Sequence, residues 1–226
     1  MEFEIDISRR FCWQGKITEK IQQLMLMFGI DIERLKNNSP CHKCKLKISK
    51  GDIVYLTGAS GSGKSVLFKE IYHYFSQNLK LNTINIDNIK LPIDKAVIDC
   101  IKANLIDSLQ LLSKAGLSDV FNILNYPALL SDGQKYRFKL ASAIADKADF
   151  VFADEFCSNL DRLTAATVAY KIARFARASG KTLILSSSHD DIISEISPDI
   201  IVIKHTSMPT EVIYKQSRKP TANSLH

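Results

Sequence analysis

Residues 58–65 read Gly-Ala-Ser-Gly-Ser-Gly-Lys-Ser, and this stretch decides the fold. The preceding residues, 52–57, are mostly apolar and β-prone, and the segment from Val66 onward has helix-compatible spacing. A glycine-rich loop between a strand and a helix cradles phosphates, because its backbone amides and the helix N-terminus converge on phosphate oxygens. We therefore expect a nucleoside triphosphate to contact Gly58, Ala59, Ser60, Gly61, Ser62, Gly63, Lys64 and Ser65.

The last two residues of this loop carry side chains suited to nucleotide chemistry. The ammonium group of Lys64 would reach the β- and γ-phosphates, and the hydroxyl of Ser65 would coordinate Mg²⁺. A glycine- and serine-rich turn with an unrelated lysine is the alternative interpretation, which the strand and helix on either side disfavour. The loop therefore predicts Mg²⁺ together with a nucleoside triphosphate.

The composition is that of an ordinary globular protein. The 226 residues suit a single domain, with 46% hydrophobic and 24% charged residues. No apolar run approaches the ~18 residues needed to cross a bilayer. The acidic, alternating residues 1–6 differ from a secretion signal, so we expect a cytoplasmic protein.

The formal net charge is +6, and basic residues gather in two places. This balance fits an acidic partner such as nucleic acid, and it fits an ordinary solvated face nearly as well. The two groups are Lys43, Lys45, Lys47 and Lys50, and Lys215, Arg218 and Lys219.

The cysteines do not form the pattern of a disulfide framework, because they are odd in number and scattered. Cys41 and Cys44 have the spacing of half a zinc site, but no second pair of ligands follows at a suitable distance. Two reduced thiols in a turn are the favoured interpretation. The five cysteines are Cys12, Cys41, Cys44, Cys100 and Cys157.

Apolar and polar residues alternate along the chain in the way that strands require. The alternation at Phe3, Ile5 and Ile7 predicts a half-exposed strand, and residues 37–40 predict a turn. After the phosphate loop we expect a helix to about Gln77 and a strand near residues 81–86.

Residues 95–125 have helical spacing, with Gly116 as a break. We expect their apolar stripe to pack in the core. The stripe consists of Ala96, Val97, Ile98, Ile101, Leu105, Leu109 and Leu112.

The second half of the chain alternates strands and helices. The apolar run 150–153 predicts a buried parallel strand, followed by a helix over 162–179 and a strand over 182–186. Residues 200–204 and 210–214 fit a closing hairpin. Together these segments predict an α/β fold with a mainly parallel sheet.

Asp154 and Glu155 come directly after the predicted buried strand. Carboxylates at the carboxyl end of such a strand lie where α/β sheets bind ligands. Asp154 would hold Mg²⁺ through its water shell, and Glu155 would orient and deprotonate the attacking water. A strand that merely ends in acidic turn residues is the alternative when the pair is considered alone.

The pair is accompanied by three further motifs, in a fixed order. Leu130-Ser131-Asp132-Gly133-Gln134 comes before it, Ser158-Asn159-Leu160-Asp161 comes after it, and His189 follows the next strand. With the phosphate loop, this order closely resembles that of the ATP-binding cassette (ABC) ATPases over roughly residues 50–205.

The resemblance implies a P-loop NTPase fold of ABC type that hydrolyses ATP with Mg²⁺. It implies one domain over residues 1–216, with an N-terminal antiparallel β portion and a short helical subdomain at about 95–130. Residues 217–226 are expected to be a flexible tail.

The resemblance also implies a homodimer in which two subunits enclose two ATP molecules. Ser131, Gly133 and Gln134 of one subunit would face the γ-phosphate held by the other, and Asp161 would couple the subunits. His189 would contact the γ-phosphate beside Glu155.

Three departures from the family pattern accompany the resemblance. Asp132 stands where the family usually has glycine, and the acidic group would weaken ATP affinity unless it points away. The family's loop glutamine is not evident, so Asp87, after the predicted strand, is the nearest substitute as a magnesium ligand. No adenine-stacking aromatic is identifiable, although Trp13 and Phe28 are candidates.

Three functions remain open. The short interval between Lys64 and Ser131, the missing glutamine and the basic charge favour a soluble ABC-type ATPase that acts on nucleic acid or a protein. Residues 154–162 and 189–191 are also similar to those of small bacterial and phage ABC-type ATPases. The ATP-binding subunit of a membrane transporter is the alternative, with a membrane partner less expected. An ATP-dependent dimerisation module with little turnover is the third.

Overall fold

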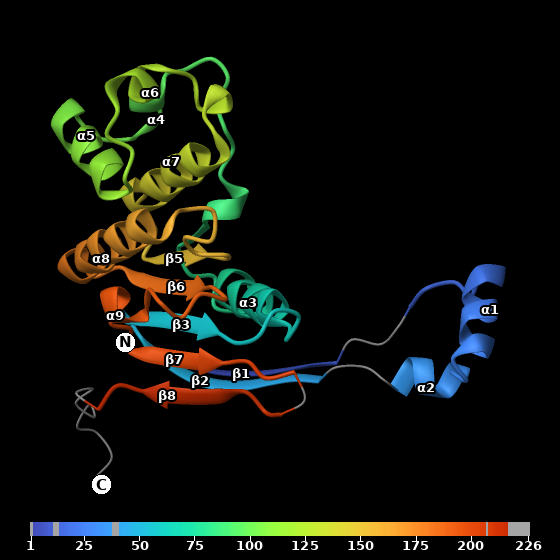
Figure 1. Cartoon of the computed structure of the whole chain (residues 1–226). Coiled ribbons are helices and arrows are strands. Elements are labelled where there is room, and N and C mark those ends of the chain that lie inside the picture. Colours follow the sequence, from blue (N-terminus) through green and yellow to red (C-terminus); the bar gives the residue numbers. More distant parts are fainter. Residues whose placement is uncertain (1, 11–13, 38–40, 207, 217–226) are drawn as a thin grey trace, which may run out of the picture.

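The computed structural model describes residues 2–10, 14–37, 41–206 and 208–216 (Figure 1). Its centre is a six-stranded sheet in the order β4-β5-β6-β3-β7-β8, in which only β8 runs antiparallel to its neighbour. The sheet confirms the predicted α/β fold with a mainly parallel sheet and a closing hairpin. The strands are β3 (Ile53–Thr57), β4 (Thr83–Asn85), β5 (Phe150–Ala153), β6 (Thr182–Ser186), β7 (Ile200–Ile203) and β8 (Glu211–Tyr214).

Two hydrophobic clusters cover the two faces of this sheet, because successive side chains of a strand point to opposite faces. Ile53 and Tyr55 of β3 pack in the cluster that contains helices α7 (Asp132–Ala145) and α8 (Arg162–Ser179). Val54 and Leu56 pack on the other face, with α3 (Lys64–His73), which continues into the π-helical turn η1 (Tyr74–Asn78). The helix predicted to end near residue 77 is therefore confirmed.

The N-terminal β portion is a two-stranded antiparallel ribbon that packs on the α3 face of the sheet. β1 (Glu2–Arg10) pairs with β2 (Cys41–Ser49), and the register runs from Glu2 opposite Ser49 to Arg10 opposite Cys41. Ile5, Leu46 and Ile48 are each at most 1% exposed in the second cluster. This ribbon confirms the half-exposed strand predicted at its start.

The ribbon is interrupted by two helices that the sequence analysis did not predict. Between its two strands lie helices α1 (Glu19–Met27) and α2 (Ile32–Asn37). We call the described residues 14–37 the arm. In Figure 1 the arm stands apart from the rest of the fold, beyond the carboxyl ends of the parallel strands. Its residues 24–28 are all apolar, so they lack the helical periodicity that makes a helix recognisable.

The helical subdomain lies on the side of the sheet that α8 covers (Figure 1). It consists of α4 (Val97–Cys100), α5 (Leu105–Lys114), α6 (Val120–Leu124) and the 3₁₀ turn η3 (Pro127–Leu129).

The predicted core stripe in this subdomain was partly wrong. Val97 and Leu112 are fully buried, but Leu105 is 63% exposed and Leu109 is 38% exposed. The chain leaves the helical conformation after α4, and the side chain of Asn104 caps a new helix, α5. This interruption changes the helical phase, so one stripe cannot continue through both helices.

The segment with Cys41 and Cys44 is part of strand β2, not the predicted turn. Cys44 is 3% exposed, and burial raises the pKa of its thiol to about 11, with Asp6 adding to the effect. This thiol is therefore a small apolar group of the core. The turn predicted at residues 37–40 largely falls on 38–40, and it lies outside the described residues together with Trp13 and the predicted tail 217–226.

Three of the four lysines in the first basic group are paired with carboxylates. Lys45 lies 3.2 Å from Asp6, Lys47 lies 3.6 Å from Glu4, and Lys50 lies 2.9 Å from Asp149. Because each pair sums to zero charge, these three lysines add little net attraction for a polyanion.

Candidate functional site

The phosphate loop connects the carboxyl end of β3 to the first turn of α3. Gly58, Gly61 and Gly63 all have positive φ angles, of 141°, 75° and 91°. At Gly58 a Cβ atom would lie 2.1 Å from the carbonyl oxygen of Lys204, which follows β7. The neighbouring strand therefore requires glycine at this position and fixes the path of the loop.

Inside the loop, Lys64 and Ser62 provide two different polar groups. Lys64 is 9% exposed, and its Nζ donates to the carbonyl oxygens of Gly58 and Ala59 at 2.8 and 2.9 Å. The Ser62 hydroxyl is one of two buried side-chain polar atoms without a hydrogen-bond partner in the described part of the chain.

These groups fit the phosphates of a nucleoside triphosphate. Helix α3 begins at Lys64 without a side-chain cap, so its first amides are available to an anion. Together with the buried Ser62 hydroxyl, they can donate hydrogen bonds to phosphate oxygens. Ser65, half-buried in the first turn of α3, offers a hydroxyl oxygen of the kind that Mg²⁺ accepts.

The predicted carboxylates gather at the same edge of the sheet. Asp154 and Glu155 follow β5, and Asp87 follows the adjacent strand β4 in the 3₁₀ turn η2 (Ile86–Asn88). Partial burial raises the pKa of Asp87, and Asp154 and then Glu155 raise it further, against the opposing effect of Lys139 and Lys69. Asp87 therefore lies within electrostatic reach of both residues.

Glu155 is exposed, and its backbone is in the left-handed region with φ 49°. Its amide donates to Oδ1 of Asp154 at 3.0 Å, while the next amide, of Phe156, donates to the carbonyl oxygen of Ser186 at 2.7 Å. The turn is thus anchored to the end of β6. A non-glycine residue in this conformation costs of order 1 kcal/mol, a cost that functional sites often carry.

The loop that carries His189 is fixed through its backbone and its neighbours. The buried Tyr55 hydroxyl donates to the carbonyl oxygen of His189, and the His189 amide donates to Oγ of Ser187 at 3.2 Å. The Thr57 hydroxyl donates to Asp190, which joins the loop to the strand that precedes the phosphate loop. The His189 side chain is left exposed at this edge.

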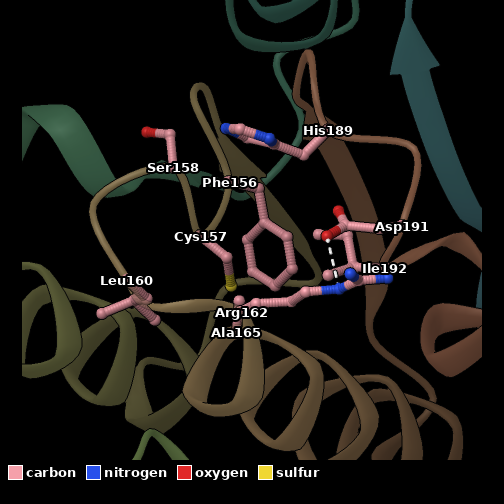
Figure 2. A pocket seen from close by; sticks show the side chains of 9 residues that line it. All are labelled: Phe156, Cys157, Ser158, Leu160, Arg162, Ala165, His189, Asp191 and Ile192. Carbon is pink, nitrogen blue, oxygen red and sulfur yellow. Dashed lines mark ion pairs between the residues drawn. The ribbon is translucent and has the colours of Figure 1, made fainter.

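A pocket of about 170 Å³ lies between the His189 loop and the segment after Glu155 (Figure 2). The ring of Phe156 stands in its middle, with His189 and Ser158 above and Arg162 below. Arg162 Nε lies 3.3 Å from Asp191 Oδ2 and closes one side. The pocket is smaller than the ~300 Å³ that ligand sites start from, so it does not hold a nucleotide by itself.

Ser131 and Gln134 form a capping box at the start of α7. Oγ of Ser131 accepts from the Gln134 amide at 3.4 Å, and Oε1 of Gln134 accepts from the Ser131 amide at 2.9 Å. Asp132 between them is 95% exposed and lies 3.7 Å from Lys135. The capping box therefore uses the amides of Ser131 and Gln134 and leaves those of Asp132 and Gly133 without an acceptor in the helix, with the Asp132 carboxylate in solvent.

The start of α7 is joined to the segment after Glu155. The Cys157 amide donates to the buried Tyr136 hydroxyl at 2.9 Å, and a Cβ atom at Gly133 would lie 3.4 Å from the carbonyl oxygen of Asn159. Burial raises the pKa of the Cys157 thiol to about 12 and that of Tyr136 well above its usual value, so both stay protonated.

Asp161 caps α8. Its Oδ1 accepts from the Thr164 amide at 3.0 Å, and the bonds to Thr164 lower the pKa of this carboxyl. Asp161 therefore fixes the start of α8 in this chain, besides any contact with a second subunit.

The structure thus brings the phosphate loop, Asp87, Asp154, Glu155 and His189 to one edge of the sheet. Ser131, Gly133 and Gln134 lie at the start of α7 instead, and Asp161 at the start of α8. The described residues contain no group of three or more His, Cys, Asp or Glu side chains placed to hold a metal ion. A Mg²⁺ ion here would therefore need oxygen ligands from the nucleotide as well as Ser65 and Asp154.

Several supporting residues escaped the sequence analysis. Tyr55, Thr57 and Tyr136 hold the functional loops, but they read as ordinary strand and helix residues. Among the supporting residues, the acidic pair after His189 was visible in the sequence. In the structure Asp190 accepts from Thr57, and Asp191 pairs with Arg162.

Three comparisons place the chain among known proteins. The ABC transporter family model matches residues 41–158, just over half of the chain. The methionine import ATP-binding protein MetN 1 of Pseudomonas fluorescens Pf-5 is 28% identical over 200 residues, covering 72% of this chain. MetN of Xanthomonas euvesicatoria is 27% identical over 203 residues, also covering 72%. The chain spans 58% of the length of both relatives.

Solved structures share the fold. A dimeric ATP-binding cassette in a post-hydrolysis state, bound to ADP and Pi, has a TM-score of 0.64 at 16% identity and covers 95% of this chain and 98% of its own. A bacterial Atm1-family ABC exporter with ATP bound has a TM-score of 0.61 at 16% identity over 76% of this chain and 35% of its own.

Proposed function

This chain belongs to the ABC transporter family of ATPases, and we propose that it is an ATP-hydrolysing subunit that drives a membrane transport component. Its ATPase chemistry follows from the family, with ATP and Mg²⁺ as the nucleotide and metal. The observation that carries the proposed ATP hydrolysis is the meeting of the phosphate loop with Asp154, Glu155 and His189 at one edge of the sheet. No helix within the described ranges has the length and apolar character needed to cross a membrane.

In the proposed reaction Glu155 takes a proton from water, whose oxygen adds to the γ-phosphorus. The bond between that phosphorus and the bridging oxygen breaks, and ADP and phosphate are the products. Lys64 and the loop amides hold the β- and γ-phosphates, and His189 contacts the γ-phosphate. Ser65 and Asp154, with Asp87 as a further ligand, would hold Mg²⁺, which would supply positive charge beside the phosphate oxygens.

We further propose that two copies enclose two ATP molecules. The start of α7, with Ser131, Gly133 and Gln134, is a helix N-terminus that can bind an anion. It lies apart from the phosphate loop of the same chain. The small pocket near His189 contains no residue of the phosphate loop. Two groups suited to phosphate that lie apart in one chain, the phosphate loop and the start of α7, support completion by a second copy, in which Asp161 lies near the contact.

A membrane component as partner is supported by the relatives, which are named as parts of a methionine importer. It is also supported by the helical subdomain, where Leu105, Ile106, Phe121 and Leu124 are each more than 60% exposed. Exposed apolar patches of this kind mark protein interfaces.

The soluble switch that acts on nucleic acid is the second candidate, and the structure weakens one of its three supports. That support is the basic charge, because Lys45, Lys47 and Lys50 are paired with carboxylates. The short interval between Lys64 and Ser131 and the missing loop glutamine are unaffected. Duplex binding that falls steeply with salt would restore this candidate.

Glu155→Gln tests the proposed function. The change removes the base but keeps the size of the side chain, so we expect kcat for ATP hydrolysis to fall about 100- to 1,000-fold while ATP still binds. Glu2→Gln, at an exposed glutamate at the start of β1, is the matched control and should leave kcat unchanged. Equal hydrolysis by the Glu155→Gln variant and the parent would contradict the assignment.

Phe121→Glu tests the membrane partner. Because it places a charge on the exposed apolar surface, it should abolish co-purification of the chain with cell membranes while ATPase activity of the purified chain stays within twofold. Recovery of the parent chain entirely in the membrane-free fraction, with full activity, would favour the soluble switch.

A further inference from the structure

The arm exposes an unusual concentration of apolar side chains. Leu26, Met27 and Phe28 are 77%, 79% and 67% exposed, and Leu24 and Ile32 are about half exposed. Met25 is the one apolar side chain of α1 that the structure buries, at 9%. Soluble proteins rarely leave such a run in water, and methionine-rich surfaces are typical of binding sites.

The arm lies outside the region that the family model matches, yet it lies on the side of the nucleotide edge. The match to the family model begins at residue 41, so the whole arm precedes it. The ribbon nevertheless leads the arm past the carboxyl ends of β3, β5, β6 and β7, which form the edge that carries the phosphate loop and Glu155 (Figure 1). The exposed residues therefore lie on the side where a second copy would complete the nucleotide site.

We propose that the arm packs against a second copy of this chain in the ATP-bound dimer. The inference rests on the dimer of the proposed function, and it adds a contact that the nucleotide itself does not make. The two copies are related by a twofold axis, so each arm contacts the other copy and the buried surface counts twice. The surface that it meets is the one that carries Ser131.

The second copy offers a matching surface there. Tyr126 and Leu129, which lead into Ser131, are 46% and 68% exposed. A tyrosine or leucine next to an exposed Phe28 and Met27 gives the aromatic and apolar core that stable interfaces have, with the phosphate contacts as the polar part. The arm would therefore continue the nucleotide interface outward.

The charges on the arm argue against a lipid surface as its occupant. The arm has four basic residues, Lys16, Lys20, Arg34 and Lys36, interspersed with three acidic ones, Glu19, Asp31 and Glu33, so the apolar run has little basic excess around it. Helices that lie on anionic membranes carry an excess of lysine and arginine around the apolar face.

The test measures dimerisation in the Glu155→Gln background with ATP and Mg²⁺, by sedimentation velocity over a range of protein concentrations. Met27→Glu places a charge on the arm. Met208→Glu, at a methionine that is 65% exposed in the β7–β8 connection, is the matched control. We expect Met27→Glu to raise the dimer Kd at least tenfold, about 1.4 kcal/mol, and Met208→Glu to change it less than twofold.

Equal dimer Kd values for the two variants would overturn the inference and leave the proposed function intact. A Glu155→Gln parent that stays monomeric with ATP would contradict the proposed dimer and the arm contact together. A melting temperature within about 2 °C of the parent shows that either variant is folded.

Amide hydrogen exchange provides a readout that needs no substitution in the arm. In the Glu155→Gln protein, ATP should slow exchange at least fivefold in the amides of α1, with no change in the exposed strand β8. Unchanged exchange in α1 under conditions in which sedimentation shows a dimer would overturn the inference independently of the variants.

Discussion

The nucleotide edge and the arm are opposite kinds of surface. At the edge, exposed functional groups such as His189 and Glu155 are held by backbone hydrogen bonds from buried neighbours, so their positions are fixed by this chain alone. On the arm, the exposed side chains are apolar and the structure gives them no such support. The difference indicates that Glu155 and His189 are positioned within one copy, whereas the contacts proposed for the arm come only from a second copy.

If this comparison holds, Lys64→Ala should have the largest effect in an isolated subunit. The ammonium group is buried in the loop and would contact two phosphates, so we expect the Kd for ATP to rise at least ~100-fold. Isothermal calorimetry measures it. Lys69→Ala, an exposed lysine on the same helix, is the control, and unchanged affinity in the Lys64 variant would refute the role of the loop.

Gly58→Ala should be the next largest effect, and it acts on folding. A methyl group there would overlap the Lys204 carbonyl, at a φ of 141°, so we expect a loss of about 3 kcal/mol or more in the free energy of unfolding by urea. At Gly180, with φ 67° and no atom within 4 Å of the added Cβ, alanine should cost only about 1 kcal/mol. Similar losses at both positions would show that the contact with Lys204 does not matter.

Tyr136→Phe probes the link between α7 and the segment after Glu155. The change leaves the Cys157 amide buried without its acceptor, so we expect a loss of about 1–3 kcal/mol in unfolding free energy and a lower kcat. Tyr126→Phe, at a half-exposed tyrosine, serves as the control. Intact stability in the Tyr136 variant would mean that the amide finds another partner.

Asp87→Asn should have a small effect of opposite sign. The folded protein raises the pKa of Asp87, so ionisation at neutral pH opposes folding. The variant should be more stable than the parent at pH 7, by less than about 1 kcal/mol because partial exposure screens the charges. The gain should vanish below about pH 4, where Asp87 is protonated in both states. A destabilised variant at pH 7 would contradict this sign.

The smallest effect is expected on the arm. Leu26→Ser removes an exposed side chain, so it should change the unfolding free energy of the monomer by less than about 0.5 kcal/mol. Met25→Ala, one residue away but buried, should cost about 1–3 kcal/mol. A large loss from Leu26→Ser would show that the arm is supported within the chain, and would end the contrast with the nucleotide edge.

The segments that carry the candidate site could be predicted from the sequence, because phosphate binding requires particular residues at fixed points between strands and helices. The loop at 58–65, the buried run before Asp154 and the helix ending at Gly180 all lie where the sequence predicts them. The arm and the supporting hydroxyls of Tyr55 and Tyr136 were not readable. An apolar run has no periodicity that separates exposure from burial, and a buried tyrosine gives no sign of the backbone group that it binds.

The helical subdomain shows a further limit. The apolar stripe from Ala96 to Leu112 was predicted without a break before Gly116, whereas the Asn104 cap starts a new helix and Leu105 is exposed to solvent. Two short helices with different phases cannot be separated by spacing alone, since the break changes which residues share a face.

The paired charges of the β1–β2 ribbon also affect how readily the chain aggregates. Lys45 and Lys47 on β2 face Asp6 and Glu4 on β1, and they alternate with the apolar residues that enter the core. A two-stranded ribbon has open edges that can recruit strands from other chains into fibrils, and charged side chains oppose such stacking. The same lysines that suggested a nucleic-acid partner thus act as gatekeepers against aggregation.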